Sequence, residues 1–223
     1  MQIRYLLVLG MGLSLTLSGC DLTESTAEAP VELSTVSPAA QTASVKEGVL
    51  HIEPSELFAG DAAKFKPFMD TAGSVKLQYT GNKKSIQTYA EIWENGSKTQ
   101  TLGPFSSSLM NEKSTPVSAE WIISMKEVKK DGEQTQGTHY AATVALVHSN
   151  GSSSMEVDVD SSIHHKISAM IPSPPELDIP DDEDAPIWGF QATDESFMKN
   201  VDFTPESLKN AKWAVVFKVG MID

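Results

Sequence analysis

The chain contains a single cysteine, Cys20, among its 223 residues. One cysteine excludes an internal disulfide, so the fold must be stabilised by its apolar core. Catalytic motifs are also missing: the sequence has no Gly-x-Ser-x-Gly, no His-Glu-x-x-His, no Cys/His metal spacing, and no phosphate-binding glycine-rich loop outside the N-terminal stretch. These absences argue against the usual exported hydrolases and metalloenzymes, and we expect a protein without catalytic activity.

Basic residues are scarce relative to acidic ones. The sequence has 17 Lys+Arg against 30 Asp+Glu, which gives a formal net charge of −13. A surface of this sign repels nucleic acid and anionic polymers. The charge therefore predicts that nucleic acid is not a partner, and it leaves cations, basic proteins and neutral glycans open.

Long hydrophobic runs are lacking, and the apolar stretch near the N-terminus is a short one. It follows Arg4, extends from Tyr5 to Leu17, and is interrupted by Gly10 and Gly12. A transmembrane helix needs about 20 consecutive apolar residues, so this stretch is too short to span a membrane. A positive residue, a short apolar run and small residues before a change in composition are instead the three regions of a secretory signal.

The end of this signal, Leu17-Ser18-Gly19-Cys20, resembles the lipobox of bacterial lipoproteins. The resemblance implies cleavage between Gly19 and Cys20 and attachment of a diacylglycerol to the Cys20 thiol. It also implies retention on the outer face of the cytoplasmic membrane, with the outer membrane as the alternative location. Two or more acyl chains give persistent membrane binding. The other interpretation is an ordinary secretory signal with a chance cysteine.

We predict three parts in the chain: a lipoprotein signal at 1–19, the lipidated cysteine and a flexible tether at 20–45, and one domain at 46–223. The tether contains Thr, Ser, Ala, Glu and Pro with only scattered apolar residues, which cannot bury enough surface to fold. A coil of about 25 residues spans roughly 25 to 30 Å. It would hold the domain near the membrane without fixing its orientation.

Hydrophobic alternation with period two dominates the predicted domain. In the run 117–126, Val117, Ala119, Trp121, Ile123 and Met125 share one face, while the polar residues share the other. Such alternation is typical of a half-buried strand. Further strands are predicted at 49–52, 75–79, 86–92, 140–146, 155–159, 163–171, 187–191 and 213–219.

The turn residues between these runs favour an antiparallel fold. Gly81-Asn82, Asn95-Gly96, Asp131-Gly132 and Asn150-Gly151 are typical of tight hairpin turns. We therefore predict a single, mainly β domain built as an antiparallel β-sandwich, with an open β-barrel as the alternative. Two short helices are expected, one within 58–69 and one starting at Thr204-Pro205, where Thr204 can cap the helix and proline can occupy its first position.

The segment from Glu176 to Asp184 concentrates six carboxylates in nine residues, directly after a proline-rich stretch. We expect a loop there, because proline removes backbone donors. One hypothesis is a calcium site formed by Asp178, Asp181, Asp182 and Asp184, since calcium prefers several carboxylate oxygens. The other is a solvated, mobile acidic loop. Calcium is the one cofactor that the sequence suggests.

Two aromatic residues and two histidines are further candidates. Tyr89 and Trp93 share one face of a predicted strand with Glu91, where they form either a binding platform for a sugar or peptide or part of the core. His164 and His165 are adjacent on a predicted strand, so they point to opposite faces and cannot bind one metal together. One exposed and one partly buried histidine is expected.

These features favour a lipid-anchored binding or interaction module of the cell envelope without catalytic activity. Its partners would be the membrane, through the lipid on Cys20, and an envelope protein or glycan. The alternative is a structural envelope domain stabilised by calcium. An enzyme acting on cell-wall glycan is a third hypothesis, which has no motif to support it.

Overall fold

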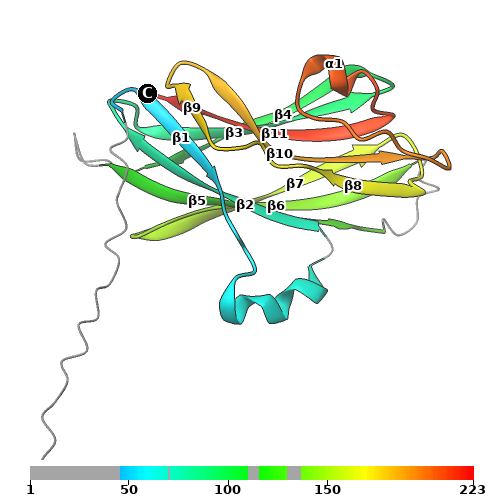
Figure 1. Ribbon diagram of the computed structural model, residues 1–223, viewed down its shortest axis with the longest axis horizontal. Helices are drawn as coiled ribbons and strands as arrows, with labels where there is room; N and C mark the ends of the chain where they lie inside the picture. The colour runs from blue at the N-terminus through cyan, green and yellow to red at the C-terminus, as the bar shows by residue number, and fades with distance from the viewer. Residues whose placement is uncertain (1–45, 70, 110–115, 130–136) are drawn as a thin grey trace, which may run out of the picture. The chain divides into compact units, whose positions relative to one another are not determined.

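The computed structural model describes residues 46–69, 71–109, 116–129 and 137–223 (Figure 1). The chain divides into two units, Met1–Thr42 and Ala43–Asp223. All described residues belong to the second unit. The predicted signal, Cys20 and the predicted tether up to residue 45 lie outside the described residues.

Strands dominate the described residues, accompanied by one 3₁₀ helix and one short α-helix. The strands are β1 (Val49–Pro54), β2 (Thr71–Thr80), β3 (Ser85–Glu94), β4 (Ser97–Ser108), β5 (Val117–Glu127), β6 (Thr138–His148), β7 (Gly151–Ser161), β8 (Ile167–Ile171), β9 (Leu177–Pro180), β10 (Asp184–Thr193) and β11 (Trp213–Ile222). The 3₁₀ helix is η1 (Gly60–Phe68), and the α-helix is α1 (Pro205–Leu208).

The strands form two antiparallel sheets that pack face to face (Figure 1). The six-stranded sheet has the order β7-β6-β5-β2-β1-β9, and the five-stranded sheet has the order β4-β3-β11-β10-β8. Side chains from both sheets meet in one hydrophobic core: the rings of Trp121 on β5 and Phe217 on β11 lie 5.9 Å apart. The predicted antiparallel β-sandwich is confirmed.

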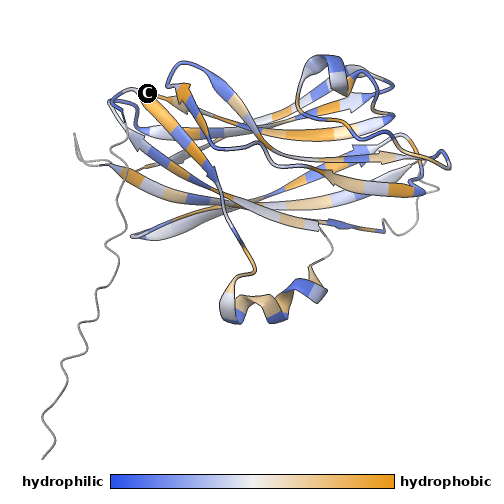
Figure 2. Cartoon of the chain, in the orientation of Figure 1, coloured by the Kyte–Doolittle hydropathy of each residue, from blue (hydrophilic) through white to orange (hydrophobic). Residues whose placement is uncertain are grey.

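The predicted register of the central strand is also confirmed. Ala119, Trp121, Ile123 and Met125 on β5 are buried, and the polar residues between them are not. Trp121 is paired with Val75 on one side and Leu146 on the other, both of which are also buried. Hydrophobic and hydrophilic residues likewise alternate along β1 (Figure 2). Burial of one face of each sheet is what fixes this register.

The predicted hairpin turns have different outcomes. Asn95-Gly96 joins β3 to β4 with positive φ angles of 48° and 75°, as a tight hairpin requires. β6 and β7 also form a hairpin, in which Ser149 and Asn150 make the turn and Gly151 is already the first residue of β7. The prediction is wrong for Gly81-Asn82, because β2 and β3 belong to different sheets and the chain crosses between them there. Asp131-Gly132 lies outside the described residues.

Both predicted helices are present. The 3₁₀ helix η1 occupies most of the predicted segment 58–69, and none of its residues is buried. In α1, Pro205 occupies the first turn, and the Ser207 backbone N–H donates to the Thr204 hydroxyl at 3.3 Å, as expected for an N-cap.

Two local predictions are wrong. The acidic segment is not simply a loop, since Leu177–Pro180 forms β9, which pairs with β1 at the edge of the six-stranded sheet. Asp184 already begins β10 in the other sheet. His164 and His165 are not on a strand, because β8 begins only at Ile167. Edge strands tolerate proline because one side of the strand has no partner, so the proline rule does not exclude β9.

Candidate functional site

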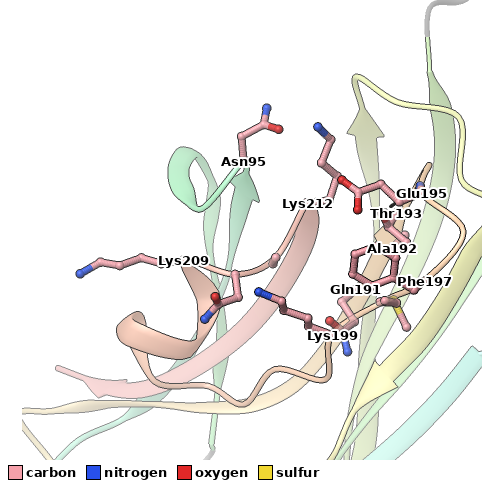
Figure 3. A pocket seen from close by; sticks show the side chains of 12 residues that line it. Asn95, Gln191, Ala192, Thr193, Glu195, Phe197, Lys199, Lys209 and Lys212 are labelled. Carbon is pink, nitrogen blue, oxygen red and sulfur yellow. Dashed lines mark hydrogen bonds between the residues drawn. The ribbon is translucent and has the colours of Figure 1, made fainter.

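A pocket of about 350 Å³ opens at one end of the five-stranded sheet (Figure 3). Its walls come from three separate parts of the chain: the end of β10 with the residues that come after it, the segment between α1 and β11, and the β3–β4 turn at Asn95. The floor is rigid, since Gln191, Ala192 and Thr193 of β10 are all buried. We call this site the lysine pocket, because Lys199, Lys209 and Lys212 line it.

The walls are held together by backbone hydrogen bonds. The Asn95 N–H donates to the Lys212 carbonyl at 2.8 Å, and the Gly96 N–H donates to the Ala211 carbonyl at 3.0 Å. A Cβ atom at Gly96 would lie 2.3 Å from the Lys209 carbonyl oxygen, so the close approach and the positive φ both require glycine. The β3–β4 turn therefore fixes the position of the segment that carries Lys209 and Lys212.

The segment that carries the lysines also covers the outer face of the five-stranded sheet. Leu208 and Ala211 are buried against Ala214 and Val216 of β11 in a second apolar cluster. The N-cap of α1 is reinforced by Asp202, whose carboxylate accepts from the Thr204 N–H and hydroxyl. These bonds lower the pKa of the exposed Asp202 carboxyl. The backbone around the pocket is thus held by packing on one side and by helix capping on the other.

The chemistry of the pocket is basic and apolar, in contrast to the chain as a whole. Among the described residues, Lys199, Lys209 and Lys212 make no ion pair, and Glu195 is the acidic residue in the lining. Phe197 lies at the opening with 62% of its surface exposed. Figure 3 shows the Lys209 side chain extending away from Lys199 and Lys212. The arrangement suits a ligand that carries negative charge together with an apolar group.

A buried Ser–His–Tyr cluster was not foreseen as a unit from the sequence. His165 Nε2 lies 2.8 Å from Ser161 Oγ, and His165 Nδ1 lies 2.6 Å from Tyr140 Oη. Burial is the main cause that lowers the pKa of His165 to about 4, while Asp194 opposes the shift. Burial also raises the pKa of Tyr140. The predicted pair of one exposed and one partly buried histidine, His164 and His165, is confirmed.

This cluster is a structural hydrogen-bond network. A nucleophilic serine must meet its substrate, whereas Ser161 has only 2% of its surface exposed. The His165 ring lies 5.0 Å from the ring of Trp213, which is fully buried. Both ring nitrogens of His165 therefore have partners that hold the imidazole against the core.

Three of the four predicted calcium ligands are held by separate partners. Asp178 Oδ1 lies 2.7 Å from His51 Nδ1, Asp181 accepts from the Tyr79 hydroxyl at 2.7 Å, and Asp184 accepts from the Tyr89 hydroxyl at 2.9 Å. Asp182 is exposed in the turn between β9 and β10. Since β9 and β10 lie in different sheets, Asp181 and Asp184 tie down the segment where the chain crosses between them.

Within the described residues, no three His, Cys, Asp or Glu side chains are grouped so that they could hold a metal ion. Calcium binding by this segment stays a prediction. Burial is the main cause that raises the pKa of Tyr79, and the Asp181 carboxylate adds to the shift.

Tyr89 and Trp93 lie on the outer face of the five-stranded sheet with different surroundings. Tyr89 belongs to a polar network in which Lys218 Nζ lies 5.6 Å from its ring centre and bridges to Glu91 at 3.7 Å. Burial, followed by the bond to Asp184, raises the pKa of Tyr89. Trp93 instead packs against the second apolar cluster under α1. Their use as a sugar or peptide platform stays a prediction.

The lysine pocket was not predicted from the sequence. Its lysines are separated along the chain, and only the β3–β4 turn at Asn95-Gly96 gave a local signal.

No helix in the described part of the chain combines the length and the apolar character needed to cross a membrane.

Comparison with known proteins places the chain in a family. The model of the YgaN domain matches residues 62–212, which include the strands of both sheets from β2 to β10 as well as α1 and the residues of the lysine pocket. A search of curated proteins and a search of solved structures each found no match. Because the match covers more than half of its length, the chain belongs to the YgaN domain family.

Proposed function

We propose that this protein is a lipid-anchored binding module of the bacterial envelope, and that its lysine pocket takes an acidic segment of a partner protein. The observation that carries the proposal is that Lys199 and Lys212 line one pocket and make no ion pair among the described residues, in a chain of net charge −13. The bound segment would place a carboxylate near the lysines and an apolar side chain on Phe197.

The surroundings of the pocket support binding more than catalysis. Binding sites combine apolar contact area with a few positioned polar groups, and this pocket has both on a rigid floor. Lysine amino groups at a rim give specificity and faster association more than affinity. The lipobox resemblance at Cys20 and the composition of the predicted tether support display of the domain close to the membrane.

The pocket is tested with a fluorescently labelled hexapeptide of alternating glutamate and phenylalanine. Fluorescence anisotropy should show binding at 50 mM salt, and Lys199→Ala/Lys212→Ala should weaken it about tenfold, as expected for two partly exposed charges. A matched peptide with lysine in place of glutamate should not bind. The control variant is Lys126→Ala, an exposed lysine of β5 in the other sheet. Equal binding by the native chain and the double variant would contradict the proposal.

The anchor is tested separately by Cys20→Ser, because a hydroxyl cannot replace the thiol in lipid transfer. The variant should remain at full length or leave the membrane fraction, as judged by fractionation and mass spectrometry of cells that make it. A Cys20→Ser chain found in membranes at the mature size would show that the lipobox interpretation is wrong.

A further inference from the structure

The 3₁₀ helix η1 exposes aromatic side chains outside the sandwich. Phe65 and Phe68 have 55% and 81% of their surfaces exposed, and no residue of η1 is buried. In Figure 1 the helix stands apart from the strands, beyond the six-stranded sheet and away from α1. The helix therefore contributes no buried side chain to the core, and its two phenylalanines are exposed to solvent. Exposed apolar patches of this kind mark interaction sites.

Basic residues flank these phenylalanines. Lys64 and Lys66 lie on either side of Phe65, with Asp61 as the acidic residue of η1. Lys64 Nζ lies 5.4 Å from the centre of the Phe65 ring, so the cation and the ring face the same surroundings. Among the described residues, neither lysine is in an ion pair. In this acidic chain, η1 is therefore locally positive and apolar.

The apolar surface continues at the base of the helix. A cavity of about 470 Å³ is lined by Lys66, Met69 and Met170 among others. Met170 has half of its surface exposed, so this cavity also offers apolar surface to a partner. Phenylalanine with adjacent lysine is the composition of segments that lie in a membrane interface, where rings enter the acyl boundary and cations meet anionic headgroups.

We propose that η1 is a membrane-contact element, and that Phe65 and Phe68 enter the interface of an anionic bilayer while Lys64 and Lys66 bind its headgroups. The membrane as partner follows from charge complementarity and from the predicted tether, which would hold the domain within roughly 25 to 30 Å of its anchor. The presence of a membrane close to η1 therefore rests on the proposed function, which includes the lipid anchor. The contact would orient the domain, because the chain as a whole carries a net charge of −13 and is repelled by the same lipids.

The test uses the native thiol as an artificial anchor. The chain from residue 20 onward retains every described residue, and its Cys20 is the only cysteine, so it can be coupled to a maleimide lipid in vesicles. The Phe68→Trp variant is then measured on vesicles of phosphatidylglycerol and phosphatidylcholine that contain brominated acyl chains. The native chain gives the baseline for its four tryptophans.

We expect strong quenching of the fluorescence added by Phe68→Trp on these vesicles. The matched control is Thr101→Trp, which places the same side chain at an exposed position of β4 in the five-stranded sheet, outside both η1 and the lysine pocket. It should show no added quenching. Equal quenching in the two variants, or none in either, would overturn the proposal. A dimer in sedimentation that is lost in Phe65→Ser/Phe68→Ser would assign the surface to a second copy of the chain instead.

The role of charge is tested in the Phe68→Trp background. Lys64→Glu/Lys66→Glu should weaken the membrane contact about tenfold or more on anionic vesicles, because each lysine near such a surface contributes to attraction. Unchanged quenching would overturn the anionic preference. Unfolding temperatures should not change, because η1 has no buried residue. Because the lipid is coupled chemically, these results do not depend on lipidation in the cell. A failure of the proposed lipid anchor, which the Cys20→Ser test would reveal, can therefore be distinguished from a failure of the membrane contact of η1.

Discussion

Asp184 on β10 and Tyr89 on β3 are joined by a 2.9 Å hydrogen bond that passes over Gly220 of the intervening strand β11. Gly220 is paired with Asp184 on one side and with Gln87 on the other, and Gln87 also donates to Asp184 at 3.2 Å. A Cβ atom at Gly220 would lie 1.7 Å from Asp184 Oδ1. The glycine is what allows a carboxylate to reach across a whole strand.

Gly220→Ala should therefore destabilise the domain by about 1 to 2 kcal/mol, because it displaces Asp184 and leaves two donors without their acceptor. The free energy of unfolding in urea measures the effect. Asp184→Ala removes the obstacle, so Gly220→Ala should cost much less in that background. Equal costs in the two backgrounds would show that the close approach is not responsible.

Trp121→Ala should cost roughly 3 to 5 kcal/mol of unfolding free energy, because it empties the centre of the core. The indole is 1% exposed, faces Phe217 of the other sheet, and donates to the Thr88 hydroxyl at 3.3 Å. Trp121→Phe retains most of the volume and should cost less than half as much. Chemical denaturation measures both variants, and a loss below about 1 kcal/mol for Trp121→Ala would be inconsistent with the packing.

The period-two signal was sufficient for the sandwich because the inner face of each sheet is buried. In β5 the alternation comes directly from that geometry, so Trp121 could be assigned to the core without knowledge of strand order. In β11 burial does not alternate, because the segment around α1 also covers Ala214 and Val216 on the outer face. The α1 cap was equally predictable, since Thr204 acts on the backbone of Ser207 only three residues away. Local chemistry is readable from local sequence.

The acidic segment and the lysine pocket depend on contacts that are distant in the chain. His51 and Asp178 are separated by 127 residues, and their pairing arises only once β9 adds to the edge of β1. The pocket needs the β3–β4 turn to meet the residues before β11. Hydrophobic periodicity carries no information on contacts between distant segments. The net charge of the chain therefore predicted that anions are repelled, whereas the fold places lysines around one pocket.

His165 should make stability depend on pH in the acidic range. Its pKa in the folded protein is about 4, below the ordinary value of 6.5, so the unfolded chain takes up a proton first as the pH falls. The contribution of the neutral imidazole is complete above about pH 6.5 and is lost as the pH falls towards 4. Allowing for partial exposure, the loss is about 2 to 3 kcal/mol.

The measurement is the difference in unfolding free energy between the native chain and His165→Gln, determined at about pH 7.5 and about pH 4.5. The difference should shrink at the lower pH by about 2 kcal/mol, because glutamine does not titrate. Carboxylates also titrate in this range, and they contribute equally to both proteins. A parallel curve for His165→Gln would contradict the assigned pKa.

The acidic segment should respond to calcium and magnesium alike. Asp178, Asp181 and Asp184 are bound to His51, Tyr79 and Tyr89, so a calcium ion would have to displace three existing contacts to collect these carboxylates. A calcium site with a dissociation constant of about 1 mM would stabilise the fold by about 1.4 kcal/mol at roughly 10 mM calcium. That would raise the unfolding temperature by about 3 to 6 °C.

We expect equal shifts with the two ions, since screening of an acidic surface does not distinguish them. A larger shift with calcium that disappears in Asp181→Asn/Asp182→Asn would establish the site, because magnesium demands octahedral geometry and retains its water.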